Sequence, residues 1–439
     1  MKLSGLIPSR RLLALAALAL GVAIAELFLP ALESAWIAAA VVATAVAAVD
    51  AWIALETQPL TAERATPASL ALGVWRSVSL RVWNRAGAAR RVDVFDHHPP
   101  ECEVRGMPQS LTIAARGWAQ IDYEVKPVRR GDVVFGPIEM RVASPLGLWS
   151  CTVREPAGAT ARVYPNFSAL TGYALLATDQ RLSHMGVLQR QRRGEGLEFH
   201  QLREYREGDT QRQVDWKATS RAGKLISREY QDERDQNIVF LIDCGRRLSA
   251  RDDELTHFDH VLNAVLLLAY VSLRQGDAAG FLTMSGPTRY MAPRKSAATV
   301  NAMLNQLYDL QPTLKTSDYY AAAVDLMLRV RKRALVVVVS NLRDEDEDTL
   351  GPALRLLGKR HLVLFASLRE AILSRAMKSR VDTFDRALTY AATAEYLRAR
   401  ELTAARLERY GAQFLDVEPT ELPLALVNRY LDIKRAGLL

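Results

Sequence analysis

The N-terminal part of the chain has a different pattern from the rest. Two apolar runs, 12–29 and 35–55, are each interrupted by a single acidic residue near an end. Each run is close to the ~20 residues that cross a bilayer core. Only five residues, 30–34, separate them. Two such runs joined by a short turn predict a transmembrane helical hairpin within residues 1–58, in preference to a cleaved signal peptide.

Positive charge predicts the orientation of this hairpin. Lys2, Arg10 and Arg11 precede the first run, whereas the connecting turn has neither Lys nor Arg. The positive-inside rule then places the N-terminus in the cytoplasm, and two crossings return the chain there. Trp36 and Trp52 are 16 positions apart, or about 24 Å along a helix, which suits the two interfacial belts of a membrane.

Residues 59–165 alternate between apolar and polar positions with a period of two. The alternation is clear at 77–82, 91–94 and 120–126, and turn residues such as Gly, Pro, Asn and Asp separate the runs. Several short alternating strands over about a hundred residues predict an antiparallel β-sandwich-like domain.

The pattern changes at residue 237 to continuous apolar runs separated by helical periodicity. The runs at 238–243, 334–340 and 361–366 have the composition of strands buried on both faces. Strands alternating with helices predict an α/β domain over 237–439 with an open, mostly parallel, doubly wound sheet. We expect helices at 252–274, 296–310, 318–332, 383–410 and 420–436, a hairpin at 278–291 and a last strand at 413–417.

Between these domains, residues 166–236 form a linker that contains a segment dense in paired charge. The segment 194–221 reads GEGLEFHQLREYREGDTQRQVDWKATSR. It is interpreted either as a docking surface that uses Arg and aromatic anchors or as an internal ion-pair network that fixes a long loop. The candidate partner-binding residues are Glu198, Phe199, Arg203, Glu204, Tyr205, Asp209, Arg212, Asp215, Trp216 and Arg221.

This segment closely resembles the signature of the bacterial family called domain of unknown function 58, with Val214 in place of Ile. Segments 129–137 and 144–149 are also similar to that family's upstream β-region. The resemblance implies a von Willebrand factor A-like domain on an anchor in the bacterial inner (cytoplasmic) membrane. It also implies a MoxR-type AAA+ ATPase as partner, for which such proteins are thought to be adaptors or assembly factors.

Domains similar to von Willebrand factor A often bind a divalent cation through D-x-S-x-S and a later Asp. Here Asp243 is present, but Gly245 and Arg247 occupy the two serine positions, and Asn341 stands where the later Asp falls. Hard cations need several oxygen donors in close array. The sequence therefore predicts a degenerate site that holds no metal.

Two further expectations concern this degenerate site. We expect Arg246 or Arg247 to neutralise Asp243 where a metal would otherwise lie. Thr316 and Ser317 are the hydroxyl residues that could replace the Thr ligand of the family pattern.

Other candidate chemistry is sparse. The net charge of +8 is spread over 439 residues and does not indicate nucleic acid. The three cysteines, including Cys244 after a predicted buried strand, suit a reducing compartment. His257 and His260 lack the H-E-x-x-H pattern and are interpreted as surface or interface residues. No catalytic set or cofactor-binding motif is apparent in the sequence.

These observations favour a membrane-anchored, non-enzymatic adaptor or scaffold that works with the ATPase in protein-complex assembly or maturation. Two alternatives belong to other classes. One is a metal-dependent enzyme or scaffold of cell-envelope biogenesis, which requires an intact oxygen-ligand cluster. The other is an adhesion-type receptor, which the positive-inside charge and the few cysteines oppose.

Overall fold

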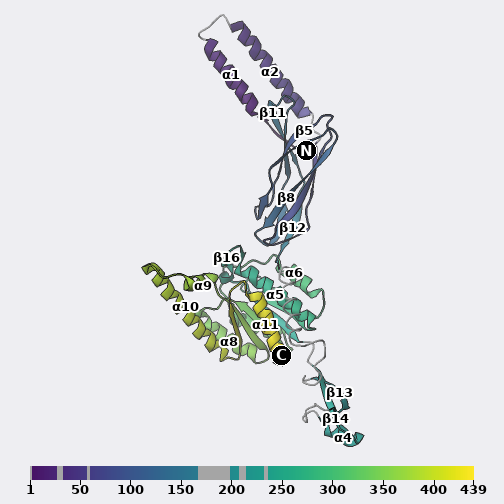
Figure 1. The fold of residues 1–439 in the computed structure, drawn as a ribbon, viewed down its shortest axis with the longest axis vertical. Coiled ribbons are helices and arrows are strands. Elements are labelled where there is room, and N and C mark those ends of the chain that lie inside the picture. Colours follow the sequence, from purple (N-terminus) through teal and green to yellow (C-terminus); the bar gives the residue numbers. More distant parts are fainter. Residues whose placement is uncertain (1, 27–32, 57–59, 167–197, 207–213, 232–235) are drawn as a thin grey trace. The chain divides into compact units, whose positions relative to one another are not determined.

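The computed structural model divides the chain into two compact units, 1–164 and 165–439 (Figure 1). Each unit is described by itself. The structure describes residues 2–26, 33–56, 60–166, 198–206, 214–231 and 236–439.

The first unit contains the two apolar segments as helices. They are α1 (Arg10–Glu26) and α2 (Glu33–Glu56). The indole N–H of Trp36 donates to the Ala19 carbonyl at 3.4 Å, so the two helices touch. Among the described residues one helix, α2, is long and apolar enough over Trp36–Leu55 to cross a bilayer, and it indicates membrane association. Most of the predicted turn lies outside the described residues.

The remainder of this unit is built of β-sheets, as the period-two pattern predicts. Val78, Leu80 and Val82 are fully buried on one face of a strand. The first sheet has the order β1 (Lys2–Pro8), β11 (Trp149–Glu155), β10 (Ile138–Ala143), β5 (Arg90–Asp96), β7 (Gln109–Ile113). The second has the order β2 (Leu60–Ala65), β4 (Arg76–Asn84), β8 (Trp118–Pro127), β6 (Cys102–Arg105), and the third β3 (Ser69–Ala71), β12 (Ala159–Tyr164), β9 (Gly131–Phe135).

A buried ion pair joins the first two sheets. Arg64 on β2 pairs with Asp96 at the end of β5, and neither side chain is more than 1% exposed. The Tyr123 hydroxyl on β8 donates to the same carboxylate at 2.5 Å. Arg64 also donates to the carbonyl of Gly136 at 2.7 Å. Because each charge has several partners, the pair fixes how the two sheets meet.

The strand β1 was not expected from the sequence. Lys2–Pro8 precedes the first apolar helix, yet it pairs antiparallel with β11, with Ile7 opposite Ser150 and Pro8 opposite Trp149. An edge strand supplied by the segment before α1 ties the N-terminus to the β-sheet that follows α2. The sequence signal for it is weak because the segment contains Gly5 and Pro8.

A single acidic side chain clamps α2 to the β-sheets. Asp50 is 1% exposed, and it accepts hydrogen bonds from the Ser144 hydroxyl at 2.5 Å and from the backbone N–H of Leu146 at 3.0 Å and of Leu148 at 3.3 Å. The indole N–H of Trp149 donates to the Ala47 carbonyl at 2.8 Å. The loop Ser144–Trp149, which connects β10 to β11, is therefore held against the helix.

The second unit contains a six-stranded sheet, parallel except for one edge strand. Its order is β19 (Tyr290–Arg294), β18 (Ala278–Met284), β15 (Asn237–Asp243), β20 (Ala334–Ser340), β21 (Leu362–Leu368), β22 (Gln413–Val417), with β19 antiparallel. Its helices are α5 (His257–Arg274), α6 (Thr299–Leu307), α7 (Tyr319–Arg329), α8 (Glu347–Gly358), α9 (Ala371–Lys378), α10 (Phe384–Glu408) and α11 (Leu422–Arg435). Short 3-10 turns cover Arg246–Ser249 and Asp344–Asp346.

Helices cover both faces of this sheet. Phe240 and Ile242 of β15 pack in one core with α5, α6 and α11. Val239 and Leu241 of the same strand pack in a second core with residues of α7 and α8. A strand buried on both faces explains why 238–242 is continuously apolar.

Helix α5 starts later than the pattern predicts. Residues 251–252 and 255–256 form two short strands, β16 (Arg251–Asp252) and β17 (Leu255–Thr256). Thr256 then caps α5 in a capping box with Asp259, and this fixes its first residue at His257. The helices α8 and α9 were not expected, because α8 contains Gly351 and Pro352 and α9 is only eight residues long.

The family-like segment forms a small β-hairpin with a short helix. Its strands are β13 (Glu198–Glu204) and β14 (Ile226–Gln231), and its helix is α4 (Trp216–Ala222). We call these three elements the signature hairpin. β13 and β14 pair antiparallel, and the helix ends at Gly223, whose φ of 65° lies in the left-handed region.

We predict that Asp50→Ala loosens the clamp between α2 and the loop Ser144–Trp149. The change strands one hydroxyl and two backbone N–H groups, at ~1–3 kcal/mol for an unpaired buried polar group. We therefore expect the unfolding midpoint of the detergent-solubilised protein to fall by about 5–10 °C.

Asp93→Ala is the matched control. Asp93 is an exposed carboxylate that accepts one hydroxyl hydrogen bond, from Ser110 at 2.5 Å. Equal midpoints for the two variants would show that Asp50 does not hold the loop.

Candidate functional site

The carboxyl ends of three neighbouring strands carry polar side chains. Asp243 ends β15, Ser340 ends β20, and Ser367 lies one residue before the end of β21. All three are fully buried. In a parallel sheet these ends lie at one edge, which is where open α/β sheets bind ligands. This edge is therefore the candidate site.

Asp243 is held by donors from its own chain. Its Oδ2 accepts from the Ser317 hydroxyl at 2.6 Å and from the Ser340 hydroxyl at 2.5 Å. Its Oδ1 accepts from the backbone N–H of Gly245 at 2.8 Å. Tyr319, also buried, contacts the Ser340 oxygen at 2.9 Å. The carboxylate thus has three close donors without any cation.

Gly245 leaves room for the serine that reaches Asp243. A Cβ at this position would lie 2.9 Å from the Ser317 hydroxyl oxygen and 3.0 Å from Asp243 Oδ1. Real Cβ atoms do not approach that closely, so a serine here would displace Ser317. Ser317, one of the two hydroxyl residues considered from the sequence, has therefore taken the space of the missing serine.

The prediction that Arg246 or Arg247 neutralises Asp243 is wrong. Arg247 turns instead to Glu345, at 2.6 Å, and to Asp346. It also donates to the Asn341 carbonyl at 3.3 Å. Arg246 is exposed. Hydroxyl and backbone donors already satisfy Asp243, so a guanidinium is not needed there.

Arg400 is the centre of this edge, and the sequence analysis did not identify it. It lies on α10 and is 3% exposed. Its guanidinium donates to the Ser367 hydroxyl at 2.5 Å and to the Leu368 carbonyl at 2.7 Å, both at the end of β21. It also pairs with Asp416 on β22 at 2.8 Å and donates to the Asn341 side chain at 3.0 Å. One side chain therefore joins the ends of three strands.

The charge on Arg400 is secured by its partners. Burial alone would lower its pKa, but the hydrogen bond and the charge of Asp416 outweigh burial, and the pKa lies above the ordinary arginine value. A planar fork of five N–H donors is the one side chain that can serve so many acceptors at once. Nothing in the local sequence marks Arg400, because arginine is frequent throughout this chain.

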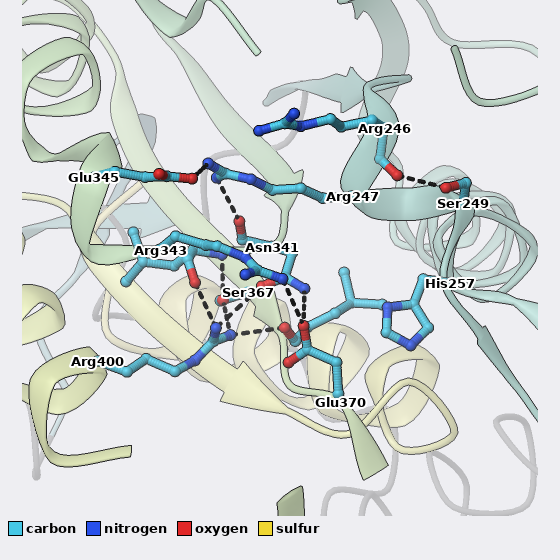
Figure 2. A network of polar contacts seen from close by, with 12 residues as sticks. Arg246, Arg247, Ser249, His257, Asn341, Arg343, Glu345, Ser367, Glu370 and Arg400 are labelled. Carbon is cyan, nitrogen blue, oxygen red and sulfur yellow. Dashed lines mark hydrogen bonds and ion pairs between the residues drawn. The ribbon is translucent and has the colours of Figure 1, made fainter. Parts of the chain in front are cut away.

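Asn341 takes part in this network in a way that an acid would not. Its side-chain oxygen accepts from Arg400, and its amide N–H donates to Glu370 at 2.8 Å. Arg343 reaches the same Glu370 oxygen at 3.4 Å. Figure 2 shows Asn341, Arg343, Ser367, Glu370 and Arg400 converging on one another. The amide bridges a cation and an anion, a role that needs both a donor and an acceptor.

The sequence analysis interpreted His257 and His260 as surface or interface residues, but both are buried within the second unit. They are 0% and 8% exposed. His257 contacts Asp252 at 2.8 Å, and this carboxylate lies near the backbone N–H of Ala371 at 3.4 Å. Burial holds the pKa of His260 below its usual value. Both residues are packing elements of the first turn of α5.

This edge does not fit the divalent cation that the family resemblance raised. Asp243 is one carboxylate already engaged by three donors, and the position of the later acid is an amide committed to Arg400 and Glu370. Within the described residues no group of three or more His, Cys, Asp or Glu is placed to hold a metal. Guanidinium groups at Arg247, Arg343 and Arg400 add positive charge that repels a cation.

The signature hairpin contains residues with structural contacts and residues with exposed side chains. Asp215 is structural, because it caps α4 at the N–H of Lys217 and Ala218 and pairs with Arg228 at 2.9 Å. The N–H of Ala218 and then Arg228 hold its pKa below the ordinary value. Glu204 pairs with Lys224, which holds the hairpin closed.

Other members of the segment face outward. Trp216 is 68% exposed, and Leu202 and Leu225 are each 47% exposed. Arg203 donates to the Glu204 carbonyl at 3.0 Å, and Tyr205 pairs through its backbone N–H with Leu225 at 2.9 Å. Arg221 lies in the last turn of α4. Glu198 and Phe199 lie in β13, whereas Asp209 and Arg212 fall outside the described residues.

We predict that Arg400→Lys destabilises the carboxyl edge of the sheet by about 2–4 kcal/mol, because an ammonium cannot serve the ends of three strands together. Hydrogen exchange of the backbone amides of β20, β21 and β22 measures the effect directly. Arg398→Lys, at an exposed position on the same helix, is the matched control. Equal protection in the two variants would show that the guanidinium is dispensable.

We also predict that Mg²⁺ or Mn²⁺ gives no saturable heat with the full-length protein at micromolar concentration. The reason is that the oxygens of Asp243 are already taken by hydroxyl and backbone donors. Calorimetry on the wild type and on Asp243→Ala measures this. Binding of one ion per chain to the wild type, lost in the variant, would contradict the prediction.

Comparison with known proteins covers the signature hairpin and much of the α/β sheet. Residues 201–388 match the model of the family described as protein of unknown function DUF58. The uncharacterized protein YeaD of Bacillus subtilis (strain 168) is 25% identical over 209 residues, which are 46% of this chain. The match spans 44% of that relative's length, less than half of it.

Likeness to solved structures is weaker. An aerotolerance-related membrane protein from Bacteroides fragilis NCTC 9343 has a TM-score of 0.32 at 13% identity, covering 46% of this chain and 99% of that one. A FixG-related protein from Vibrio parahaemolyticus has a TM-score of 0.19 at 9% identity, covering 24% and 98%. These TM-scores are too low to transfer a fold or a function. The family match includes residues 201–231 of the signature hairpin.

Proposed function

We propose that this protein is a non-enzymatic adaptor, held in the inner membrane by two helices, that binds a partner protein through its signature hairpin. The partner that the family resemblance suggests is a MoxR-type AAA+ ATPase, to which the adaptor would present client proteins. Its α/β sheet would be a von Willebrand factor A-like domain with a degenerate metal site.

The observation that carries this proposal is the exposure of apolar side chains on the signature hairpin. Two paired strands and a short helix bury too little apolar surface to be stable alone. The hairpin nevertheless has ordered internal bonds, through the Asp215 cap and the pair of Glu204 with Lys224. A closed scaffold that leaves Trp216 exposed has the properties of a docking element with an aromatic anchor.

The state of the carboxyl edge is consistent with a binding role. Asp243 accepts a hydrogen bond from Ser317, and Arg400 donates to the Asn341 side chain and to the Leu368 carbonyl. Groups used in catalysis need an approach for substrate and an open coordination or hydrogen-bonding position. A sheet edge closed by its own side chains supports a structural role for the α/β sheet.

The pairing of β1 with β11 supports two crossings. The strand before α1 and the sheet after α2 hydrogen-bond to each other, so both must lie on the same side of the membrane. If α2 crosses the bilayer, α1 has to cross it as well. Arg10 and Arg11 at the start of α1 then favour the cytoplasmic side for the soluble domains.

The test is copurification of the full-length protein from detergent-solubilised membranes, tagged at Leu439, with ATP present. We expect a AAA+ ATPase to be recovered with the wild type and to be reduced at least about tenfold by Trp216→Ala, the size of effect typical of a central aromatic anchor. Mass spectrometry identifies and quantifies the ATPase.

Trp118→Ala is the matched control, because Trp118 on β8 is also exposed, at 60%. Equal recovery of the ATPase with both variants would refute docking through the signature hairpin. A wild-type eluate without any AAA+ ATPase would refute the choice of partner.

A further inference from the structure

We propose that the loop Ser144–Trp149 of the β-sheet unit is immersed in the interfacial layer of the bilayer, where Leu146 contacts lipid. This inference rests on the membrane anchoring proposed above and deepens it. The β-sheets of the first unit would then contact the membrane directly through this loop.

The first argument is the length of helix on the membrane side of the clamp. Glu33, the first residue of α2, and Asp50 are 17 positions apart (50 − 33), which is about 26 Å of helix at ~1.5 Å per residue. A hydrocarbon core is ~30 Å thick. Even with the first residue of α2 at the far edge of the hydrocarbon core, Asp50 does not reach the near edge, and neither does the loop bonded to Asp50.

The second argument is that the loop fixes the start of α1 as well. The backbone N–H of Ser9 donates to the Leu148 carbonyl at 2.9 Å, and the Ser9 hydroxyl donates to the Gly147 carbonyl at 2.6 Å. A Cβ at Gly147 would lie 3.1 Å from Nη1 of Arg11, so this guanidinium lies against the loop. The loop is therefore bonded both to the start of α1 and to Asp50 within α2, so neither helix can move along the membrane normal without it.

The third argument is that the loop has no backbone donor left for water. The N–H groups of Ser144 and Gly147 bond to backbone carbonyls, those of Leu146 and Leu148 bond to Asp50, and that of Trp149 bonds to the Ser144 hydroxyl. The remaining residue, Pro145, has no N–H. Complete internal satisfaction of donors is what backbone needs where water is scarce.

The side chains around the loop have the composition of an interfacial layer. Leu146 is 54% exposed, Ile7 on β1 is 44% exposed, and Trp52 on α2 is 63% exposed. The indole of Trp149 bonds to the carbonyl of Ala47, which is three residues deeper along α2 than Asp50. Tryptophan at the boundary, an exposed leucine beside it and an arginine that can reach phosphate are typical of interfacial anchors.

The test measures depth in the membrane with a fluorophore attached to single introduced cysteines. Full-length Leu146→Cys, Val42→Cys and Val134→Cys are labelled with an environment-sensitive dye and reconstituted into vesicles that contain lipids brominated at a shallow or a deep acyl position. Val42 on α2 is 62% exposed in the middle of the span. Val134 on β9 is 61% exposed, and Figure 1 shows β12, the partner of β9, toward the end of this unit opposite the two helices.

The native thiols interfere little with this labelling. Cys102, Cys151 and Cys244 are at most 5% exposed, and burial raises the pKa of the Cys102 thiol to about 11. Buried thiols with few thiolates react slowly. The parent protein without an introduced cysteine measures the remaining background.

We expect lipids brominated at the deep position to quench the dye at Val42. At Leu146 we expect quenching by lipids brominated at the shallow position, together with a blue-shifted emission. At Val134 we expect neither lipid to quench the dye. If the dye at Val42 is quenched but the dye at Leu146 behaves like that at Val134, the inference is overturned and the anchor stands. The same holds if the dye at Leu146 is blue-shifted but neither lipid quenches it, because protein then covers this position. A Val42 dye that no lipid quenches would refute the anchor itself, and the inference with it.

Discussion

The α/β sheet depends on how the carboxyl ends of its buried strands are satisfied. Parallel strands end with side chains and carbonyls in an apolar setting, where each unpaired polar group costs ~1–3 kcal/mol. Arg400 meets this constraint at the ends of β20, β21 and β22 with one guanidinium. Ser317 and Ser340 meet it at the end of β15 by bonding to Asp243. The edge is closed by the chain's own polar side chains.

This closure changes where function is to be sought. A bound cation could satisfy the oxygens of such an edge with a single charge. Here side-chain donors satisfy them, and these donors come from α10 and from the loop before α7. The edge thereby becomes part of the folding core and stabilises the packing of α10. Exposed apolar groups elsewhere include Trp216 on the signature hairpin and Leu146 in the loop Ser144–Trp149, the two surfaces proposed above to meet a protein and lipid.

The sequence predicted the regular parts of the fold because periodicity reports burial directly. Strands at 334–340 and 413–417 were predicted to the residue, and the first of them is a continuous apolar run. The start of α5 was missed because a side-chain cap at Thr256 decides it, and caps compete with propensity over a few residues. Arg400 could not be found because its role comes from contacts with residues 16 to 59 positions away.

Topology carries information that no local pattern contains. Lys2–Pro8 looks like a short leader before a span, yet as β1 it completes a sheet whose other strands follow α2. In the sequence Asp50 only interrupts an apolar helix, but in the structure its carboxylate accepts the hydrogen bonds that order the loop Ser144–Trp149. Charge inside an apolar helix is costly unless it is satisfied. Three donors from the loop Ser144–Trp149 satisfy Asp50, and they therefore fix the rotation of α2 about its axis relative to the β-sheets of the same unit.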